Sequence, residues 1–109
     1  MSVALDYGDE ELTDYTAFRS TGLSVGAIPW IDKRSATFWN VTKGLINKER
    51  LEAFREYVLS KYTGIYSKRK MLNFAKAFLR YLSKTRFDMR YKDFDLFLEM
   101  PRAVKETNG

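Results

Sequence analysis

The sequence predicts an all-α fold, a small helical bundle that follows an irregular N-terminal arm. Apolar residues beyond residue 45 recur at steps of three and four, the spacing of one face of an α-helix. No stretch alternates apolar and polar residues as a half-buried strand would. The 109 residues, 45% of them hydrophobic, suffice for one domain with a single core.

Residues 1–44 are predicted to form the arm. Four glycines and one proline interrupt this segment at short intervals, and it shows no sustained helical period. Residues 1–18 hold five acidic and no basic residues, so we expect a mobile acidic tip. Trp30 and Trp39 are expected to pack onto the helical body or onto a partner, with base stacking as the alternative.

Residues 45–105 are predicted to form the helical domain, and residues 106–109 to begin a linker. Asn47 can cap a first helix, which Gly64 would end, because apolar residues lie at helical spacing between them. Ser67 can cap a second, longer helix with a continuous apolar stripe.

A third, shorter helix is expected around residues 94–98, capped by Asp88 and ended by Pro101. The acidic residues of this region could form a catalytic pair or a Mg²⁺ site, but a helix cap and a solvated face fit their spacing better. They are Asp88, Asp93, Asp95 and Glu99.

The second helix carries the most informative pattern in the sequence. At about 100° per residue, five polar side chains fall opposite its apolar stripe and form a basic ridge. No acidic residue occurs between Arg69 and Lys84, although a solvated face normally mixes signs and like charges at i,i+4 repel. We therefore predict that the compensating charge comes from duplex DNA phosphates, the alternative being a merely solubilising surface. The basic ridge consists of Arg69, Asn73, Lys76, Arg80 and Lys84.

The predicted DNA-binding residues extend beyond this ridge. Between Lys61 and Lys92, ten basic residues face a single acid. Asn73 is expected near base edges and the cations on phosphates. The tyrosines are expected to pack, although Tyr66 or Tyr91 could instead donate a hydrogen bond to a phosphate. The predicted set is Lys68, Arg69, Asn73, Lys76, Arg80, Lys84, Arg86 and Arg90.

The composition excludes most enzyme chemistry. The chain contains no Cys and no His, which rules out disulfides, thiol nucleophiles, Cys/His zinc sites and Ser-His-Asp triads. We predict no catalytic residue, no metal, no cofactor and no small-molecule substrate. No apolar run is long enough to span a bilayer and residues 1–14 lack the basic start of a secretory signal, so we expect a cytoplasmic protein without membrane contact.

Three segments carry a resemblance to a known family. Residues 50–58 (RLEAFREYV), 68–82 (KRKMLNFAKAFLRYL) and 94–102 (FDLFLEMPR) are similar in order and spacing to the core-binding domain of tyrosine recombinases, the phage and archaeal-type integrases. The resemblance spans roughly residues 45–105 and implies a SAM-like helical clamp. It further implies that the chain grips a recombination site beside other recombinase subunits, while a catalytic domain that it lacks cuts the DNA.

Two functions from different classes remain open at this point. The first is DNA binding as the core-binding module of an integrase. The second is a helical protein-protein interaction module whose basic surface has no ligand. The absence of acids from the ridge favours the first.

Overall fold

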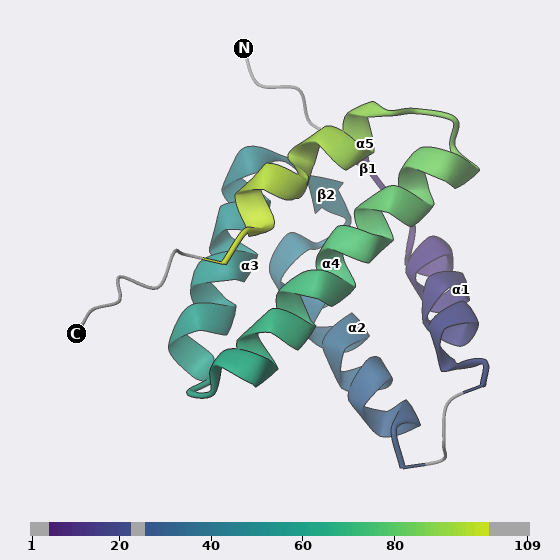
Figure 1. Cartoon of the computed structure of the whole chain (residues 1–109). Coiled ribbons are helices and arrows are strands. Elements are labelled where there is room, and N and C mark those ends of the chain that lie inside the picture. The colour runs from purple at the N-terminus through teal and green to yellow at the C-terminus, as the bar shows by residue number, and fades with distance from the viewer. Residues whose placement is uncertain (1–4, 23–25, 101–109) are drawn as a thin grey trace.

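The computed structural model describes residues 5–22 and 26–100 of the chain, and helices account for most of them (Figure 1). The predicted all-α bundle is confirmed, with a small antiparallel sheet added to it. In chain order the elements are β1 (Leu5–Asp6), α1 (Asp9–Ser20), α2 (Ile28–Thr42), β2 (Leu45–Ile46), α3 (Lys48–Lys61), α4 (Ile65–Thr85), α5 (Arg90–Asp93) and the 3-10 helix η1 (Phe94–Leu98).

The prediction of an irregular arm over residues 1–44 is wrong. Within this segment α1 and α2 form regular helices of 12 and 15 residues. Both pack against α4, and their buried residues belong to the same core as those of α3 and α4. Residue 44 is therefore not a boundary between an arm and a folded body.

The helical pattern of α1 and α2 escaped notice because their buried faces include polar and aromatic residues. Tyr15, Thr16 and Thr42 are buried, and the hydroxyls of both threonines donate to carbonyl oxygens four residues earlier in their own helices. The glycines and the proline mark helix ends. Gly8 is the N-cap of α1 and Pro29 lies in the first turn of α2, where a missing N–H costs nothing.

The two-stranded sheet ties the start of the chain to the connection between α2 and α3. Leu5 pairs with Ile46, and the Tyr7 N–H donates to the Gly44 carbonyl oxygen at 3.0 Å. Gly44 has a φ of +83°, and a Cβ atom there would lie 3.2 Å from the Tyr7 carbonyl oxygen. The close approach of these two backbone segments therefore requires glycine.

The α4 helix is the centre of the bundle. It runs diagonally across the view in Figure 1 and packs against α1, α2, α3, α5 and η1. Phe78 of α4 meets the rings of Tyr7 and Phe38 at centroid distances of 5.0 and 5.6 Å, and Phe38 in turn meets Phe54 of α3 at 5.0 Å. Edge-on aromatic pairs of this kind add to the stabilisation that burial provides.

The predicted ends of the helices are partly correct. The Asn47 side chain caps α3 by accepting the Arg50 N–H at 2.8 Å, as expected. Gly64 does not end that helix. It is the N-cap of α4 with φ −85°, and Ser67 lies within the first turn of α4 rather than capping it. The error has a simple cause, since Ile65 and Tyr66 are exposed and gave no buried-face signal for this turn.

The predicted third helix is present as α5 continued by η1. Asp88 acts near its start, where its carboxylate accepts the Arg90 N–H at 3.0 Å. Pro101, the end of the predicted domain at residue 105 and the linker over residues 106–109 lie outside the described residues. In the part of the chain that the structure describes, no helix is both long and apolar enough to cross a membrane.

Candidate nucleic-acid interface

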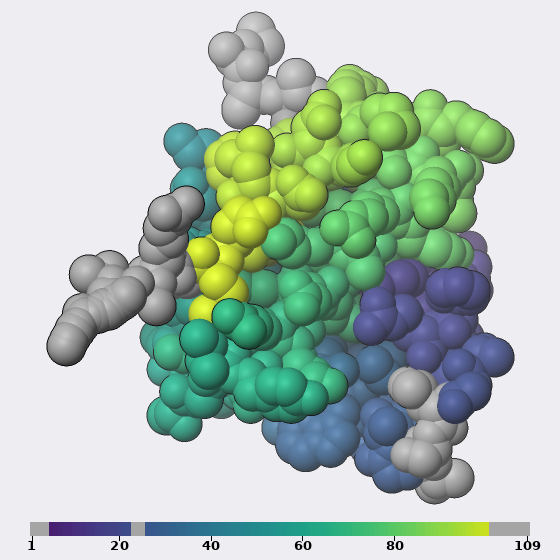
Figure 2. Space-filling model, in the orientation of Figure 1, coloured from purple at the N-terminus to yellow at the C-terminus, as the bar shows by residue number. Residues whose placement is uncertain are grey.

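The polar face of α4 lies on the surface of the bundle. Figure 2 shows its side chains between η1 on one side and α1 on the other. Arg69, Asn73, Arg80 and Lys84 are exposed, whereas the opposite stripe through Phe78 is fully buried. The helical arrangement predicted for the basic ridge is therefore correct.

Lys76 is the member of the ridge that the fold neutralises. Its Nζ lies 3.0 Å from a carboxylate oxygen of Glu99, just beyond η1, and its side chain is only 19% exposed. The expectation that every ridge cation would find its counter-charge outside the protein is wrong for this residue. Sequence spacing could not indicate the pair, because the two residues are 23 positions apart and meet only when η1 packs on α4.

Arg86 lies beyond the end of α4 and joins the start of the chain to its last helices. Its guanidinium donates to both carboxylate oxygens of Glu11. It also donates to a side-chain oxygen of Asp6 at 3.0 Å, to the Asp6 carbonyl oxygen at 2.8 Å and to the Tyr91 hydroxyl at 2.6 Å. The Tyr91 hydroxyl itself donates to the Asp6 carbonyl oxygen at 2.6 Å. Arg86 and Tyr91 thus hold the fold together and are already engaged.

The ionisation of this cluster follows from its contacts. Burial alone would raise the pKa of Glu11, but hydrogen bonds from Arg86 and from the Gly8 N–H outweigh it and lower that pKa. The same hydrogen bonds to Glu11 and Asp6 raise the pKa of Arg86. Both partners are therefore charged over the whole physiological range.

Arg90 has an internal partner as well. Its guanidinium donates to the Asp88 carboxylate at 2.6 and 3.0 Å, and this contact raises the pKa of Arg90 and lowers that of Asp88. The Arg90 side chain is nevertheless more than half exposed. A phosphate could approach it only in competition with Asp88. That acid is not the N-cap predicted for it, because the N-cap of α5 is Met89; Asp88 stands one residue earlier and accepts the Arg90 N–H.

Some of the predicted DNA-binding residues are exposed and have no acidic partner among the described residues, so an external anion can reach them. They form a band along α4 that extends about 22 Å from Arg69 to Lys84 at 1.5 Å per residue. No ion pair involves any of its cations within residues 5–22 and 26–100. We name this group the open ridge, and it consists of Arg69, Asn73, Arg80 and Lys84. Lys68, the other predicted residue of α4, is half-buried and lies on the side of the helix that carries Leu72.

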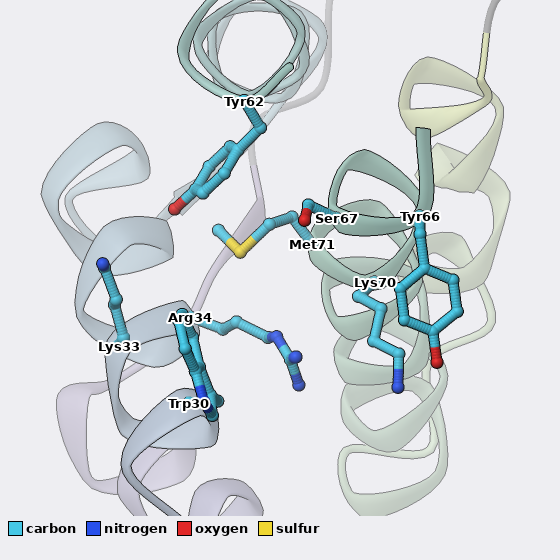
Figure 3. A pocket seen from close by; sticks show the side chains of 8 residues that line it. All are labelled: Trp30, Lys33, Arg34, Tyr62, Tyr66, Ser67, Lys70 and Met71. Atoms are coloured by element: carbon cyan, nitrogen blue, oxygen red, sulfur yellow. The ribbon is translucent and has the colours of Figure 1, made fainter. Parts of the chain in front are cut away.

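Sequence reasoning missed a second polar feature, a groove between α2 and the first turns of α4. Figure 3 shows Trp30 and Arg34 of α2 on one side of it and Tyr66 and Lys70 of α4 on the other. The signal was present in residues 30–34, where a tryptophan is followed closely by two bases. An irregular arm, as predicted for residues 1–44, gives these side chains no common face, whereas the α2 helix brings Trp30 and Arg34 to one side of the groove. Trp39, by contrast, packs against Tyr7 as expected.

The open ridge and the groove present positive charge, and the groove adds aromatic rings. No group of three or more metal-ligating side chains occurs in the part of the chain that is described. Comparisons with models of known protein families, with curated proteins and with solved structures found no match. The function must therefore be argued from the surface of the molecule itself.

Proposed function

We propose that this protein binds duplex DNA through the open ridge of α4. One observation carries the proposal: the 21 residues of α4 contain six bases and no acid, and the exposed cations of the open ridge have no internal counter-charge among the described residues. Arg80 and Lys84 even stand at the i,i+4 spacing at which like charges repel. A row of phosphates would relieve that repulsion because it places negative charge beside both cations, and each contact would also release a condensed counterion.

The geometry of α4 suits a DNA groove. A single exposed α-helix fits the width of the major groove, and about 22 Å of helix spans six to seven base pairs at about 3.4 Å each. Asn73 lies in the middle of the open ridge, where its amide can pair with an adenine edge while the flanking cations contact phosphates.

The biological setting that we propose rests on the resemblance described above. As a core-binding domain of a tyrosine recombinase, the chain would clamp a recombination site for a catalytic domain outside this sequence and for neighbouring subunits. The helical bundle is compatible with that role. The chain itself would break no DNA, in agreement with the expectation that it carries no catalytic residue.

A protein-interaction module is the second candidate, and one observation favours it. Phe87 is 95% exposed in the connection between α4 and α5, and Met89 beside it is also exposed. Two large apolar side chains at a loop tip are typical of a contact with another protein. This surface lies just beyond the C-terminal end of α4, where it could serve partner subunits of a DNA-bound assembly.

A salt titration of duplex binding tests the proposal. With the three cations of the open ridge on phosphates, log affinity should fall against log salt with a slope of about −3. Arg80→Ala should shallow the slope by about one unit and weaken binding on the order of tenfold at 0.1 M salt. Lys48→Ala, which removes the same charge from α3, is the matched control and should change neither value. Equal losses in both variants would leave only non-specific attraction and overturn the proposed interface.

A further inference from the structure

The groove between α2 and α4 combines aromatic walls with unneutralised positive charge. Its volume is about 220 Å³, and Trp30, Tyr62 and Tyr66 line it together with Lys33, Arg34 and Lys70. No carboxylate is among the described residues that line it. Figure 3 shows the guanidinium of Arg34 extending from α2 into the space between the two helices.

The cations of the groove are held beside aromatic rings instead of acids. The Lys70 ammonium lies 4.8 Å from the centre of the Tyr66 ring, and the Lys33 ammonium lies 5.4 Å from that of Trp30. No ion pair involves either lysine or Arg34 in the described segments. Burial and the charge of nearby Arg19 lower the pKa of Arg34, as expected where positive charges gather without a counterion.

Aromatic rings and unpaired cations in one groove together indicate the chemistry of the ligand. An inorganic anion would need the cations but no aromatic wall, and an apolar ligand would need the wall but no cations. The ligand must carry both a flat ring and a negative charge. The Trp30 side chain is 55% exposed and can accept a stacked ring, while Met71 provides a buried apolar floor.

We propose that this groove binds one nucleotide, with its base against Trp30 and its phosphate between Arg34 and Lys70. The volume is sufficient for a single base. Ser67, in the first turn of α4, adds a hydroxyl donor at the same edge. The preference for a nucleotide over another aromatic phosphate rests on the proposed DNA-binding function, since Lys70 and the open ridge share one helix.

Titrations monitored by isothermal calorimetry test the site. Adenosine monophosphate should bind at least tenfold more tightly than inorganic phosphate or adenosine, because stacking contributes about 1–3 kcal/mol. The bound nucleotide could be free in solution or could be the end of an unpaired DNA strand, and a 5′-phosphorylated four-nucleotide DNA strand distinguishes the two. If this strand binds more tightly than the monophosphate, the site takes an unpaired strand end; if both bind equally, it takes a free nucleotide. Three outcomes would each overturn the proposal. They are equal affinities for inorganic phosphate and the nucleotide, a higher affinity for phosphotyrosine than for the nucleotide, and no binding of the nucleotide at millimolar concentration.

Substitutions separate this site from the duplex interface. Trp30→Ala and Arg34→Gln should each weaken nucleotide binding about tenfold and leave the affinity for a blunt duplex unchanged. Arg80→Ala should do the reverse. Arg34→Lys keeps the charge and should retain most of the binding, which guards against a folding defect at this half-buried position. If Trp30→Ala and Arg34→Gln leave nucleotide binding intact while Arg80→Ala abolishes it, the groove is not the site, whereas the open ridge stands.

Discussion

Replacement of Arg86 by methionine separates a structural cation from a DNA-binding one. The sequence placed Arg86 among the DNA contacts, but its guanidinium is shared among Glu11, Asp6 and Tyr91. Methionine retains much of the aliphatic stem and removes every one of these hydrogen bonds. We expect Arg86→Met to lower the free energy of unfolding and to leave the DNA affinity of the folded protein nearly unchanged.

The magnitude follows from the exposure of the cluster. A hydrogen bond to a charged group contributes about 1.5–3 kcal/mol when it is well shielded, and an exposed ion pair contributes about 0.2–1 kcal/mol. The Arg86 side chain is 33% exposed, so the cluster lies between these limits. Because four acceptor groups lose their donor together, we expect a destabilisation of about 2–3 kcal/mol, which shifts a urea midpoint by about 1–2 M for a chain of this size.

Equilibrium unfolding in urea, followed by circular dichroism, measures this loss. Arg80→Ala is the control, since its exposed side chain should change stability by less than about 0.5 kcal/mol. In a double-mutant cycle, Glu11→Gln should show a coupling of at least about 1 kcal/mol with Arg86→Met. The reasoning is refuted if Arg86→Met unfolds at the wild-type midpoint and loses DNA affinity as Arg80→Ala does.

Three further predictions concern backbone strain and a buried hydroxyl. Gly44→Ala should destabilise the fold by about 1–3 kcal/mol in urea, because φ is +83° and the new Cβ would press on the Tyr7 carbonyl oxygen; an unchanged midpoint would show that the sheet can shift. Phe87→Gly should stabilise it by about 0.5–1 kcal/mol, since Phe87 has φ +53° and an exposed ring, and loss of stability would indicate a hidden contact. Burial raises the pKa of Tyr7 to about 12, so the stabilisation that the neutral Tyr7 hydroxyl provides should be complete below pH 10 and should be lost as the pH rises from 10 to 12. In thermal melts across this range, the melting temperature should therefore fall more steeply for the wild type than for Tyr7→Phe.

The body of the fold was predictable from local signals, and the first 44 residues were not. The cap of α3 and the apolar spacing of α3 and α4 can each be recognised within a single helix: Asn47 accepts the Arg50 N–H and the Phe78 face of α4 is buried, both as predicted. In α1 and α2 the buried face contains tyrosine and threonine, whose hydroxyls find partners only in the folded state. The Tyr7 hydroxyl and Thr42 Oγ1, 35 positions apart, meet at 2.5 Å. No periodicity of apolar residues reveals such a pair.

The candidate site also combines features that one helix determines with features that depend on contacts between distant elements. The placement of Arg69, Arg80 and Lys84 on one exposed face follows from helical geometry alone. The pairing of Lys76 with Glu99 depends on a contact between distant elements. Sequence reasoning about charge therefore identified the face correctly and overestimated how many of its cations are available.

The structure engages acids that the sequence predicts to lie in a mobile tip. A mobile acidic tip would be free to lie across the basic ridge and compete with DNA, and deletion of residues 1–18 would then raise DNA affinity at low salt. The structure places Asp6 and Glu11 on Arg86 and buries Leu12 and Tyr15 in the core. The deletion should therefore unfold the protein, which circular dichroism would detect directly. The double substitution Asp6→Asn and Glu11→Gln removes the two charges and keeps the core residues. If this variant binds DNA more tightly and its stability is unchanged, the acids compete with DNA after all.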